Sequence, residues 1–351
     1  MLRSELVSAT ATMPAAVYKG NHTVVVEEIP VPEVGPNQVL LEISHCGICG
    51  TDLHMVMEDW GRPGSTGGHE YSGVVAKLGR DVEGWAVGDR AVGGPTAGCG
   101  VCRQCAAGCT NLCEGRPNSG VDPFVGAFAL YKALESGALY RVPDGIDLRT
   151  AALTEPLAVA LRGVRRAAAK VDDRVLVTGA GPIGLLTVAL LGAQGVSDVT
   201  VSEPSPKRQS LALKVGAARV IAPDELEPPA LPMEIVASPY QLAFECSGRS
   251  DAMEAALASL DRAGTLILSG SGMRRPRFDP NRIIMNELVV TGTYEYTQED
   301  YRLAMDFLTT GRLPTETLIE PDDQPLGRLQ WAMEQLTAGE LAGKVMVVPD
   351  A

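Results

Sequence analysis

Eight cysteines are the residues most able to do chemistry in this chain of 351 residues, and seven of them lie in its first third. Five cysteines fall within fifteen residues, and four of them have the spacing C-x2-C-x2-C-x7-C: Cys99, Cys102, Cys105 and Cys113. Four thiolates on one loop suit a structural Zn²⁺ whose coordination positions are all closed. A bacterial ferredoxin cluster would use Cys109 as its fourth cysteine, but Thr110 follows where that pattern has proline, so zinc is favoured.

A second group combines a thiol, an imidazole and a carboxylate. Cys49, His69 and Glu70 offer one of each, a set that suits a zinc ion with one position open for substrate. Cys46 and Cys49 could instead form a thioredoxin-like redox pair. Such a pair normally opens a helix, whereas the Gly, Thr, Asp and His that follow Cys49 predict an irregular loop. Zinc with one thiolate, one carboxylate and neutral histidine also sums to zero charge.

A glycine-rich turn predicts a dinucleotide site in the second half of the chain. It follows the strand-like run 175–177, opens an apolar helix, and consists of Gly179, Gly181, Pro182, Ile183 and Gly184. The first glycine makes the turn, the second lets the backbone approach a pyrophosphate, and the third lets helix and strand pack closely. The phosphates would then lie at the N-terminus of the helix.

The choice of coenzyme is predicted from the residues after the next strand. Glu203 lies 19 positions past Gly184, where a carboxylate accepts hydrogen bonds from both ribose hydroxyls and repels a 2′-phosphate. We therefore expect NAD rather than NADP. Lys207 and Arg208 follow closely, and either could soften this exclusion.

The elements that position these residues divide the chain near Pro156. Before it, short β-type runs separated by Pro- and Gly-rich turns predict an irregular, barrel-like β domain: 15–18, 23–27, 38–43 and 71–77. After it, strands and helices alternate, which predicts an α/β unit with a doubly wound parallel sheet: strands 174–178, 198–202, 242–246 and 265–269, with helices 183–193, 207–215 and 252–260. Helices 299–310 and 329–337 and a strand 344–349 are expected to pack back onto the first domain.

Composition limits the possible partners. Thirty Lys and Arg against 43 Asp and Glu give a net charge of −13, and the resulting field repels nucleic acid and anionic membranes. No apolar run is long enough to span a bilayer, and the first residues lack the pattern of a signal peptide. We expect a cytoplasmic protein whose partners are small molecules or copies of itself. Residues 1–12 are expected to be a frayed extension, or else the biological start is Met13.

Together these motifs resemble the zinc-dependent medium-chain dehydrogenase/reductase family of alcohol, polyol and threonine dehydrogenases. The resemblance runs over nearly the whole chain from Met13. It rests on the CGxCGTDxH loop, the GHExxGxV block, the four-cysteine lobe and the GxGxxG turn. Three shorter matches support it: Glu155-Pro156, Glu245-Cys-Ser-Gly248 and Gly343-Lys-Val345.

The resemblance implies a ligand set for each of two zinc ions per chain. Cys49 and His69 become ligands of the catalytic zinc, and Glu70 a ligand or near-ligand that exchanges with substrate or water. Glu155 stands where liver-type alcohol dehydrogenases have a cysteine ligand, as on the sorbitol and threonine dehydrogenase side of the family. Cys113, in preference to Cys109, completes the structural zinc site.

The resemblance also implies a proton path and a substrate pocket. The proton leaves an alcohol through Thr51, a coenzyme ribose hydroxyl and His54, while hydride passes to NAD. Trp60 and Phe128 are expected to line the pocket. Met55 follows His54 where sorbitol-type enzymes have an aromatic residue, which argues against a sugar-alcohol pocket.

The expected architecture is a GroES-like catalytic domain (1–157 and 298–351) with a zinc lobe (about 95–115), plus a Rossmann NAD-binding domain (158–297). The expected activity is reversible oxidation of a secondary alcohol, such as a polyol, cyclitol or amino alcohol, to a ketone. The alternatives are a primary alcohol or aldehyde reductase of the same family and a non-catalytic, zinc-stabilised NAD(H)-binding protein. An edge strand near 288–291 predicts a homodimer or homotetramer.

Overall fold

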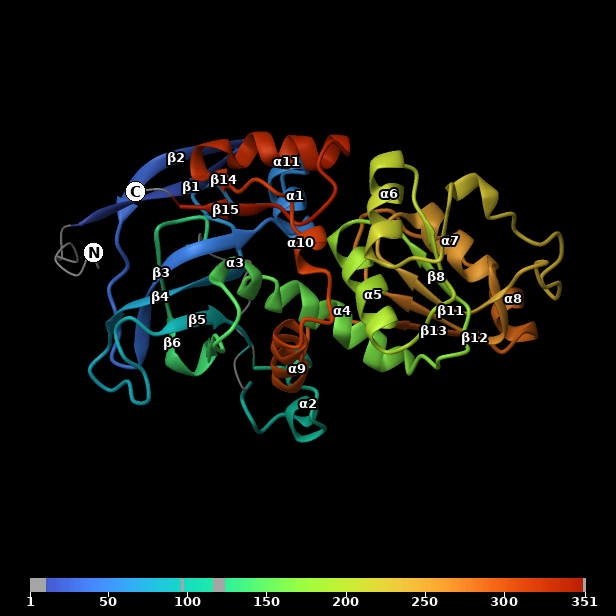
Figure 1. Cartoon of the computed structure of the whole chain (residues 1–351), viewed down its shortest axis with the longest axis horizontal. Helices are drawn as coiled ribbons and strands as arrows, with labels where there is room; N and C mark the ends of the chain where they lie inside the picture. The colour runs from blue at the N-terminus through green and yellow to red at the C-terminus, as the bar shows by residue number, and fades with distance from the viewer. Residues whose placement is uncertain (1–10, 96–97, 116–123, 350–351) are drawn as a thin grey trace. The chain divides into compact units, whose positions relative to one another are not determined.

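The computed structural model describes residues 11–95, 98–115 and 124–349, which form two compact units (Figure 1). The first unit comprises Met1–Glu155, Thr297–Thr309 and Ile319–Ala351, and the second comprises Pro156–Tyr296 and Thr310–Leu318. The segment 310–318 therefore belongs to the second unit, although the sequence places it with the first. Residues 1–10, most of the expected N-terminal extension, lie outside the described residues.

The first unit is built on β-strands. A seven-stranded sheet has the order β14-β15-β3-β4-β5-β7 with β6 paired to β3, and β1 and β2 form an antiparallel hairpin. The strands are β1 (Thr12–Gly20), β2 (Thr23–Pro30), β3 (Gln38–Gly47), β4 (Glu70–Leu78), β5 (Arg90–Gly93), β6 (Tyr131–Glu135), β7 (Leu139–Arg141), β14 (Gln324–Pro325) and β15 (Met346–Val348). The pairing of β15 with β3 returns the C-terminal segment to this unit, as the sequence predicts.

Short helices connect these strands, and one of them corrects a prediction. The helices are α1 (Gly50–Met57), α2 (Arg103–Ala106), α3 (Leu148–Ala151), α9 (Gln298–Thr309) and α11 (Leu329–Ala338). The prediction of an irregular loop after Cys49 is wrong, because Cys49 is the N-cap of α1. Asp52, the third helical residue, accepts a hydrogen bond from the Cys49 amide at 2.9 Å, as in a capping box.

The second unit has the expected doubly wound fold. Its six strands are all parallel, in the order β10-β9-β8-β11-β12-β13. The strands are β8 (Val175–Thr178), β9 (Val199–Ser202), β10 (Arg219–Ile221), β11 (Tyr240–Glu245), β12 (Leu260–Leu268) and β13 (Val289–Gly292). The helices are α5 (Pro182–Ala193), α6 (Pro206–Val215), α7 (Ser250–Ala258), α8 (Pro280–Met285) and α10 (Thr315–Leu318), with α4 (Thr154–Ala167) leading into the unit.

Burial explains why these segments fold in this way. All four residues of β8 are buried, as expected for a central parallel strand covered on both faces. Eight consecutive residues of α5, 184–191, are buried, so this helix is apolar on nearly every side. It packs beside α6 (Figure 1). The strand order reverses at β8, and its carboxyl end is where ligands bind in such sheets.

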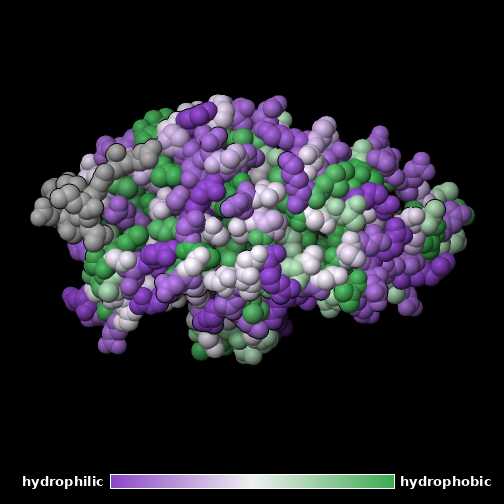
Figure 2. Space-filling view, viewed as in Figure 1, coloured by the Kyte–Doolittle hydropathy of each residue, from purple (hydrophilic) through white to green (hydrophobic). Residues whose placement is uncertain are grey.

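The hydropathy of one face and the length of the helices bear on membrane association. Hydrophobic side chains on the face shown in Figure 2 are interspersed with hydrophilic ones. Within the described ranges, the helices are all too short or too polar to cross a bilayer.

Candidate functional site

Three predicted ligands converge in the first unit. Ligand atoms of Cys49, His69 and Glu70 all lie within 4.8 Å of one another. Cys49 caps α1, His69 precedes β4, and Glu70 is the first residue of β4, so the helix start and the strand start meet at this point. A thiolate, an imidazole and a carboxylate are ligands that Zn²⁺ accepts in catalytic sites, and the residues present therefore fit the ion.

Asp52 holds two of these ligands in place. Its side chain is buried, and its two oxygens accept hydrogen bonds from the amides of Cys49 at 2.9 Å and Gly68 at 3.0 Å. One oxygen also lies 3.9 Å from Nδ1 of His69. A carboxylate behind a ligating histidine orients the ring and raises its basicity. The sequence analysis assigned no role to Asp52, although its place three residues after Cys49 is a capping signal.

The electrostatic field of the group attracts a cation. Desolvation would lower the pKa of His69, but the Cys49 thiol and the Asp52 and Glu155 carboxylates raise it well above the usual range. The same negative charges that favour a proton on His69 favour a divalent cation beside it. The His69 side chain remains 42% exposed, so the group opens to solvent.

Glu70 is paired with a buried lysine from the far end of the chain. Nζ of Lys344 lies 2.7 and 2.5 Å from the two carboxylate oxygens of Glu70 and 2.9 Å from the carbonyl oxygen of Ile48. Both side chains are at most 2% exposed. A Cβ on Gly47 would lie 2.3 Å from Glu70 Oε2, so a larger residue at position 47 would displace the pair. A metal bound by Cys49 and His69 would compete with Lys344 for this carboxylate.

Glu155 acts electrostatically on the group formed by Cys49, His69 and Glu70 but is not within ligand distance of all three. It lies in the first turn of α4 and is 9% exposed. Its charge raises the pKa of both His69 and Lys344. Among the described residues, the group within ligand distance of Cys49 consists of Cys49, His69 and Glu70, so a direct ligand role for Glu155 stays a prediction.

The two predicted proton-relay residues follow Cys49 on α1. Thr51 is exposed, and its Oγ1 lies 3.7 Å from Cys49 Sγ. His54 lies one turn further along and is 21% exposed. Its ring stacks on Trp60, with centroids 4.6 Å apart and an angle of 15° between the planes. Phe128, the other aromatic residue expected in the pocket, is only 1% exposed and belongs to the hydrophobic core.

The four-cysteine lobe forms the second metal-binding group. Sulfur atoms of Cys99, Cys102, Cys105 and Cys113 lie within 4.8 Å of one another, and Cys109 is outside the group. Backbone amides point at the sulfurs: Cys99 N to Cys113 Sγ at 3.2 Å, Cys102 N to Cys99 Sγ at 3.4 Å and Cys105 N to Cys102 Sγ at 3.4 Å. These hydrogen bonds stabilise thiolates before any metal binds.

The pKa values of two sulfurs show this effect. The amides of Cys105 and Glu114 lower the pKa of Cys102 to about 6. The amides of Cys99 and Gly115 also lower the pKa of Cys113. Four convergent sulfurs, two of them with a lowered pKa, suit a closed tetrahedral Zn²⁺ site.

Cys46 differs from the other cysteines of the first unit. It is fully buried, and burial raises the pKa of its thiol well above the usual range. A low thiol pKa is what activates the cysteine of a redox pair. The burial of Cys46 therefore argues against the thioredoxin-like alternative, although the helix that follows Cys49 does not.

The glycine-rich turn connects β8 to α5 in the second unit. A Cβ on Gly184 would lie 1.9 Å from the carbonyl oxygen of Gly179, so only glycine allows this approach of helix to turn. A Cβ on Gly181 would meet no atom within 4 Å. Gly181 is the N-cap of α5, and Pro182 opens the helix. Open space at a helix N-terminus fits a pyrophosphate.

A cavity of about 690 Å³ adjoins this turn. Glu203 lines it but is only 3% exposed, and its two oxygens accept hydrogen bonds from the amides of Ala180 at 2.8 Å and Ser205 at 2.9 Å. The carboxylate thus supports the glycine-rich turn itself. Arg208 and Arg249 line the same cavity.

Comparison with known proteins decides the family. The model of the alcohol dehydrogenase GroES-like domain matches residues 35–144, and the model of the zinc-binding dehydrogenase matches residues 182–310. Sorbitol dehydrogenase of Bacillus subtilis is 31% identical over 96% of this chain and 98% of its own. The chain belongs to the zinc-dependent medium-chain dehydrogenase family. It is therefore an oxidoreductase with a GroES-like and a Rossmann unit.

Solved structures of other dehydrogenases share the fold over nearly the whole chain. That of 2R,3R-butanediol dehydrogenase from Bacillus subtilis has a TM-score of 0.83 and 29% identity, and covers 96% of this chain and 100% of its own. A zinc-binding dehydrogenase structure from Sinorhizobium meliloti 1021, bound to NADP, has a TM-score of 0.84 and 30% identity, and covers 97% and 100%.

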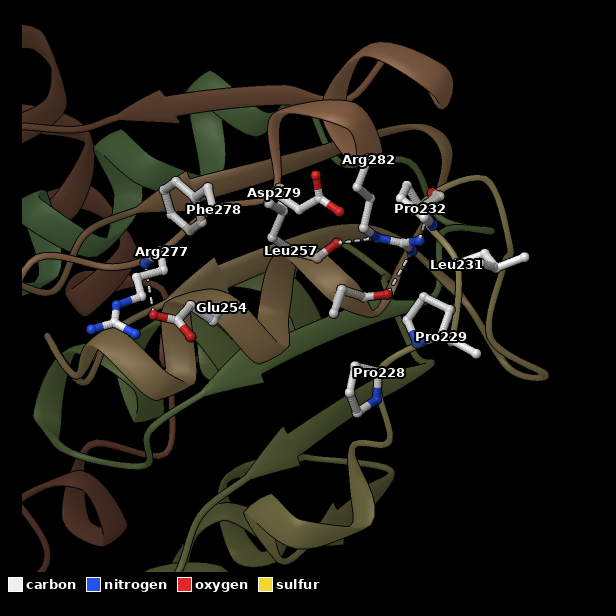
Figure 3. A pocket seen from close by; sticks show the side chains of 12 residues that line it. Pro228, Pro229, Leu231, Pro232, Glu254, Leu257, Arg277, Phe278, Asp279 and Arg282 are labelled. Carbon is white, nitrogen blue, oxygen red and sulfur yellow. Dashed lines mark hydrogen bonds between the residues drawn. The ribbon is translucent and has the colours of Figure 1, made fainter.

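A smaller cavity in the Rossmann unit of this dehydrogenase is lined in part by Arg282, whose contacts are structural. It measures about 190 Å³ and lies beside the proline-rich loop 228–232 (Figure 3). Arg282, 4% exposed, donates all five N–H groups to backbone carbonyls: Pro232, Glu234, Leu257, Ala258 and Leu260. Arg282 therefore fixes the loop to the end of α7, and none of its donors is left for a ligand.

Proposed function

We propose that this dehydrogenase reversibly oxidises a secondary alcohol to a ketone with NAD, using a zinc ion held by Cys49, His69 and a carboxylate from Glu70 or Glu155. A second zinc ion would close the four-cysteine lobe. The observation that supports the proposal most is the convergence of ligand atoms of Cys49, His69 and Glu70 within 4.8 Å, at the start of the helix that also carries His54.

Each residue then has a task in the reaction. When bound, zinc polarises the hydroxyl of the alcohol and the nicotinamide ring accepts the hydride. Asp52 keeps Cys49 and His69 aligned, as its contacts with both support. Thr51 accepts a hydrogen bond from the substrate hydroxyl, and His54 receives the proton as the general base.

The substrate class rests on relatives and on the site. Sorbitol and 2R,3R-butanediol dehydrogenases, both relatives of this chain, act by their names on vicinal diols, and this supports a polyol, cyclitol or amino alcohol. The negative charge of Glu203 favours NAD over NADP. Arg208 and Arg249 in the same cavity soften that preference, in keeping with the relative that binds NADP.

We further propose a cytoplasmic homo-oligomer. β13 is the last strand of the parallel sheet, and the exposed apolar residues on it or within five residues of it in the chain are Ile284, Met285, Val289 and Tyr294. Pairing of two such edges would cover them. All eight cysteines are free, which suits a reducing compartment.

A substrate screen tests the proposal. Secondary alcohols, polyols, amino alcohols and primary alcohols are assayed for NADH formation with the zinc-loaded protein and with Cys49→Ser. We expect oxidation of secondary alcohols by the wild type and none by Cys49→Ser, which still folds because serine is a good N-cap. Preference for primary alcohols would identify the aldehyde reductase alternative. One zinc per chain and no oxidation of any alcohol would identify a non-catalytic NAD(H)-binding protein.

A further inference from the structure

Glu58 makes a contact with His54 that the activity described so far does not use. Its Oε1 lies 3.0 Å from Nδ1 of His54, one helical turn back. The two residues stand at positions i and i+4, where side chains of a helix meet. Glu58 is 47% exposed and His54 is 21% exposed, so the pair extends from the interior to solvent.

The turn after α1 places Glu58 and Trp60 beside the His54 ring. Glu58 caps the helix, and its amide donates to the carbonyl of His54 at 3.2 Å. The amide of Trp60 donates to the same carbonyl at 3.4 Å, and the Trp60 ring stacks on the imidazole. His54 is thereby covered on one ring face and bonded on one nitrogen.

The β1–β2 hairpin anchors the turn. Asp59 has a φ of 57°, a left-handed conformation that a non-glycine residue rarely adopts. Its carboxylate accepts hydrogen bonds from the Tyr18 hydroxyl and, at 3.2 Å, from the amide of His22. His22 Nε2 lies 3.4 Å from the other oxygen. These contacts stabilise Asp59 in that conformation and so fix Glu58 and Trp60 on either side of it.

An ionised carboxylate can only accept hydrogen bonds. A neutral His54 beside Glu58 therefore carries its hydrogen on Nδ1 and leaves Nε2 as the acceptor. When a proton arrives on Nε2, the ring becomes an imidazolium that the Glu58 charge and the Trp60 ring face both stabilise. Free histidine prefers the opposite tautomer, so the contact with Glu58 decides which nitrogen can accept the proton.

We propose that Glu58 is a positioning residue that holds His54 in the Nδ1–H tautomer, so that Nε2 receives the proton released in alcohol oxidation. For each hydride transferred from the substrate carbon to NAD, one proton leaves the substrate hydroxyl, reaches Nε2 and then passes to water. This role rests on the proposed function for the source of the proton; the tautomer itself does not depend on it.

Nitrogen NMR of ¹⁵N-histidine-labelled, zinc-loaded protein reads the tautomer directly. The chain has only four histidines, and His54→Gln identifies the His54 signals by their loss. In the wild type we expect Nδ1 protonated and Nε2 unprotonated. The Glu58→Gln amide can either accept from Nδ1 or donate to it and should give a mixture of the two tautomers, whereas Glu58→Ala should shift the population to Nε2–H.

Kinetics supply the second readout. Glu58→Ala should lower kcat for the alcohol about tenfold, a part of the 10²- to 10⁴-fold that proton transfer by a positioned group contributes, and leave KM within about twofold. Glu27→Gln is the matched control, because it also removes an exposed carboxylate from an ion pair, with Lys19 at 2.6 Å. It should change neither readout.

Unchanged His54 signals and unchanged kcat in Glu58→Ala would overturn the inference while leaving the proposed function intact. A wild type that oxidises no alcohol would refute the proposed function instead, and the NMR comparison would still decide the tautomer.

Discussion

Lys344→Met tests how the buried ion pair supports the metal site. Methionine is similar in length to lysine, so the substitution leaves little cavity but removes the only cation that contacts both oxygens of Glu70 among the described residues. Removing one partner of a buried pair costs about 3–5 kcal/mol, because the other charge stays buried and unpaired. For a domain of about 200 residues, this corresponds to about 6–20 °C in Tm.

Thermal unfolding is measured by calorimetry. All variants carry Cys49→Ser, so that a catalytic zinc ion cannot replace Lys344 as the partner of Glu70. Lys344→Met should lower the Tm of the first unit by that amount, and adding Glu70→Gln should restore most of it. Lys132→Met is the control, because Lys132 donates to the carbonyl of Val125 at 2.7 Å and lies 5.8 Å from the centre of the Tyr71 ring, contacts whose loss should cost about 1–2 kcal/mol. A Tm change in Lys344→Met no larger than in Lys132→Met, or no recovery with Glu70→Gln, would refute the reasoning.

The pKa of Lys344 determines how the Tm difference between wild type and Lys344→Met changes with pH. Burial would lower the pKa of Lys344, but Glu70, Cys49 and Glu155 raise it above the ordinary value. A group whose pKa is raised in the folded state contributes its full stability below the unfolded pKa, about 10.4 for lysine. The Tm gap between wild type and Lys344→Met should thus be constant from about pH 7 to 9 and shrink only above about pH 10.4.

Three further changes test other parts of the structure. Gly184→Ala places a Cβ 1.9 Å from the Gly179 carbonyl oxygen, and overpacking of about 1–3 kcal/mol should weaken NADH binding about 5- to 150-fold in a fluorescence titration without changing zinc content. Glu203→Ala removes a charge that repels a 2′-phosphate and should raise the NADP-to-NAD ratio of kcat/KM about tenfold or more; an unchanged ratio would contradict the role of Glu203. Arg282→Met removes five guanidinium hydrogen bonds to backbone carbonyls, and hydrogen exchange in 226–239 should increase strongly while exchange in the first unit stays unchanged.

Local patterns were enough to predict most of the fold. The alternation of strands and helices after Pro156 has a clear period, and each segment appears within a few residues of its expected place, for example α5 at Pro182–Ala193 for 183–193. The ligand motifs are equally local, because His69 and Glu70 are adjacent and the four cysteines share one loop.

What the sequence did not reveal depends on contacts between distant segments. Lys344 and Glu70 are 274 positions apart, and nothing in the sequence around Lys344 indicates that it lies beside a metal site. The turn that places Glu58 beside His54 is held by the hydrogen bond from the Tyr18 hydroxyl to Asp59, and Tyr18 lies on the β1–β2 hairpin, 41 positions earlier in the chain. α1 was missed for another reason: it is only eight residues long and begins with Gly-Thr-Asp, a composition typical of loops.

Anomalous diffraction at the zinc absorption edge, from crystals of the purified chain, tests the central claim most directly. Two peaks per chain are expected, one bounded by Cys49 and His69 and one within the four cysteines of the lobe, and crystals of Cys49→Ser should keep only the second. A wild-type map with the lobe peak alone would contradict the assignment of a catalytic zinc site to Cys49 and His69.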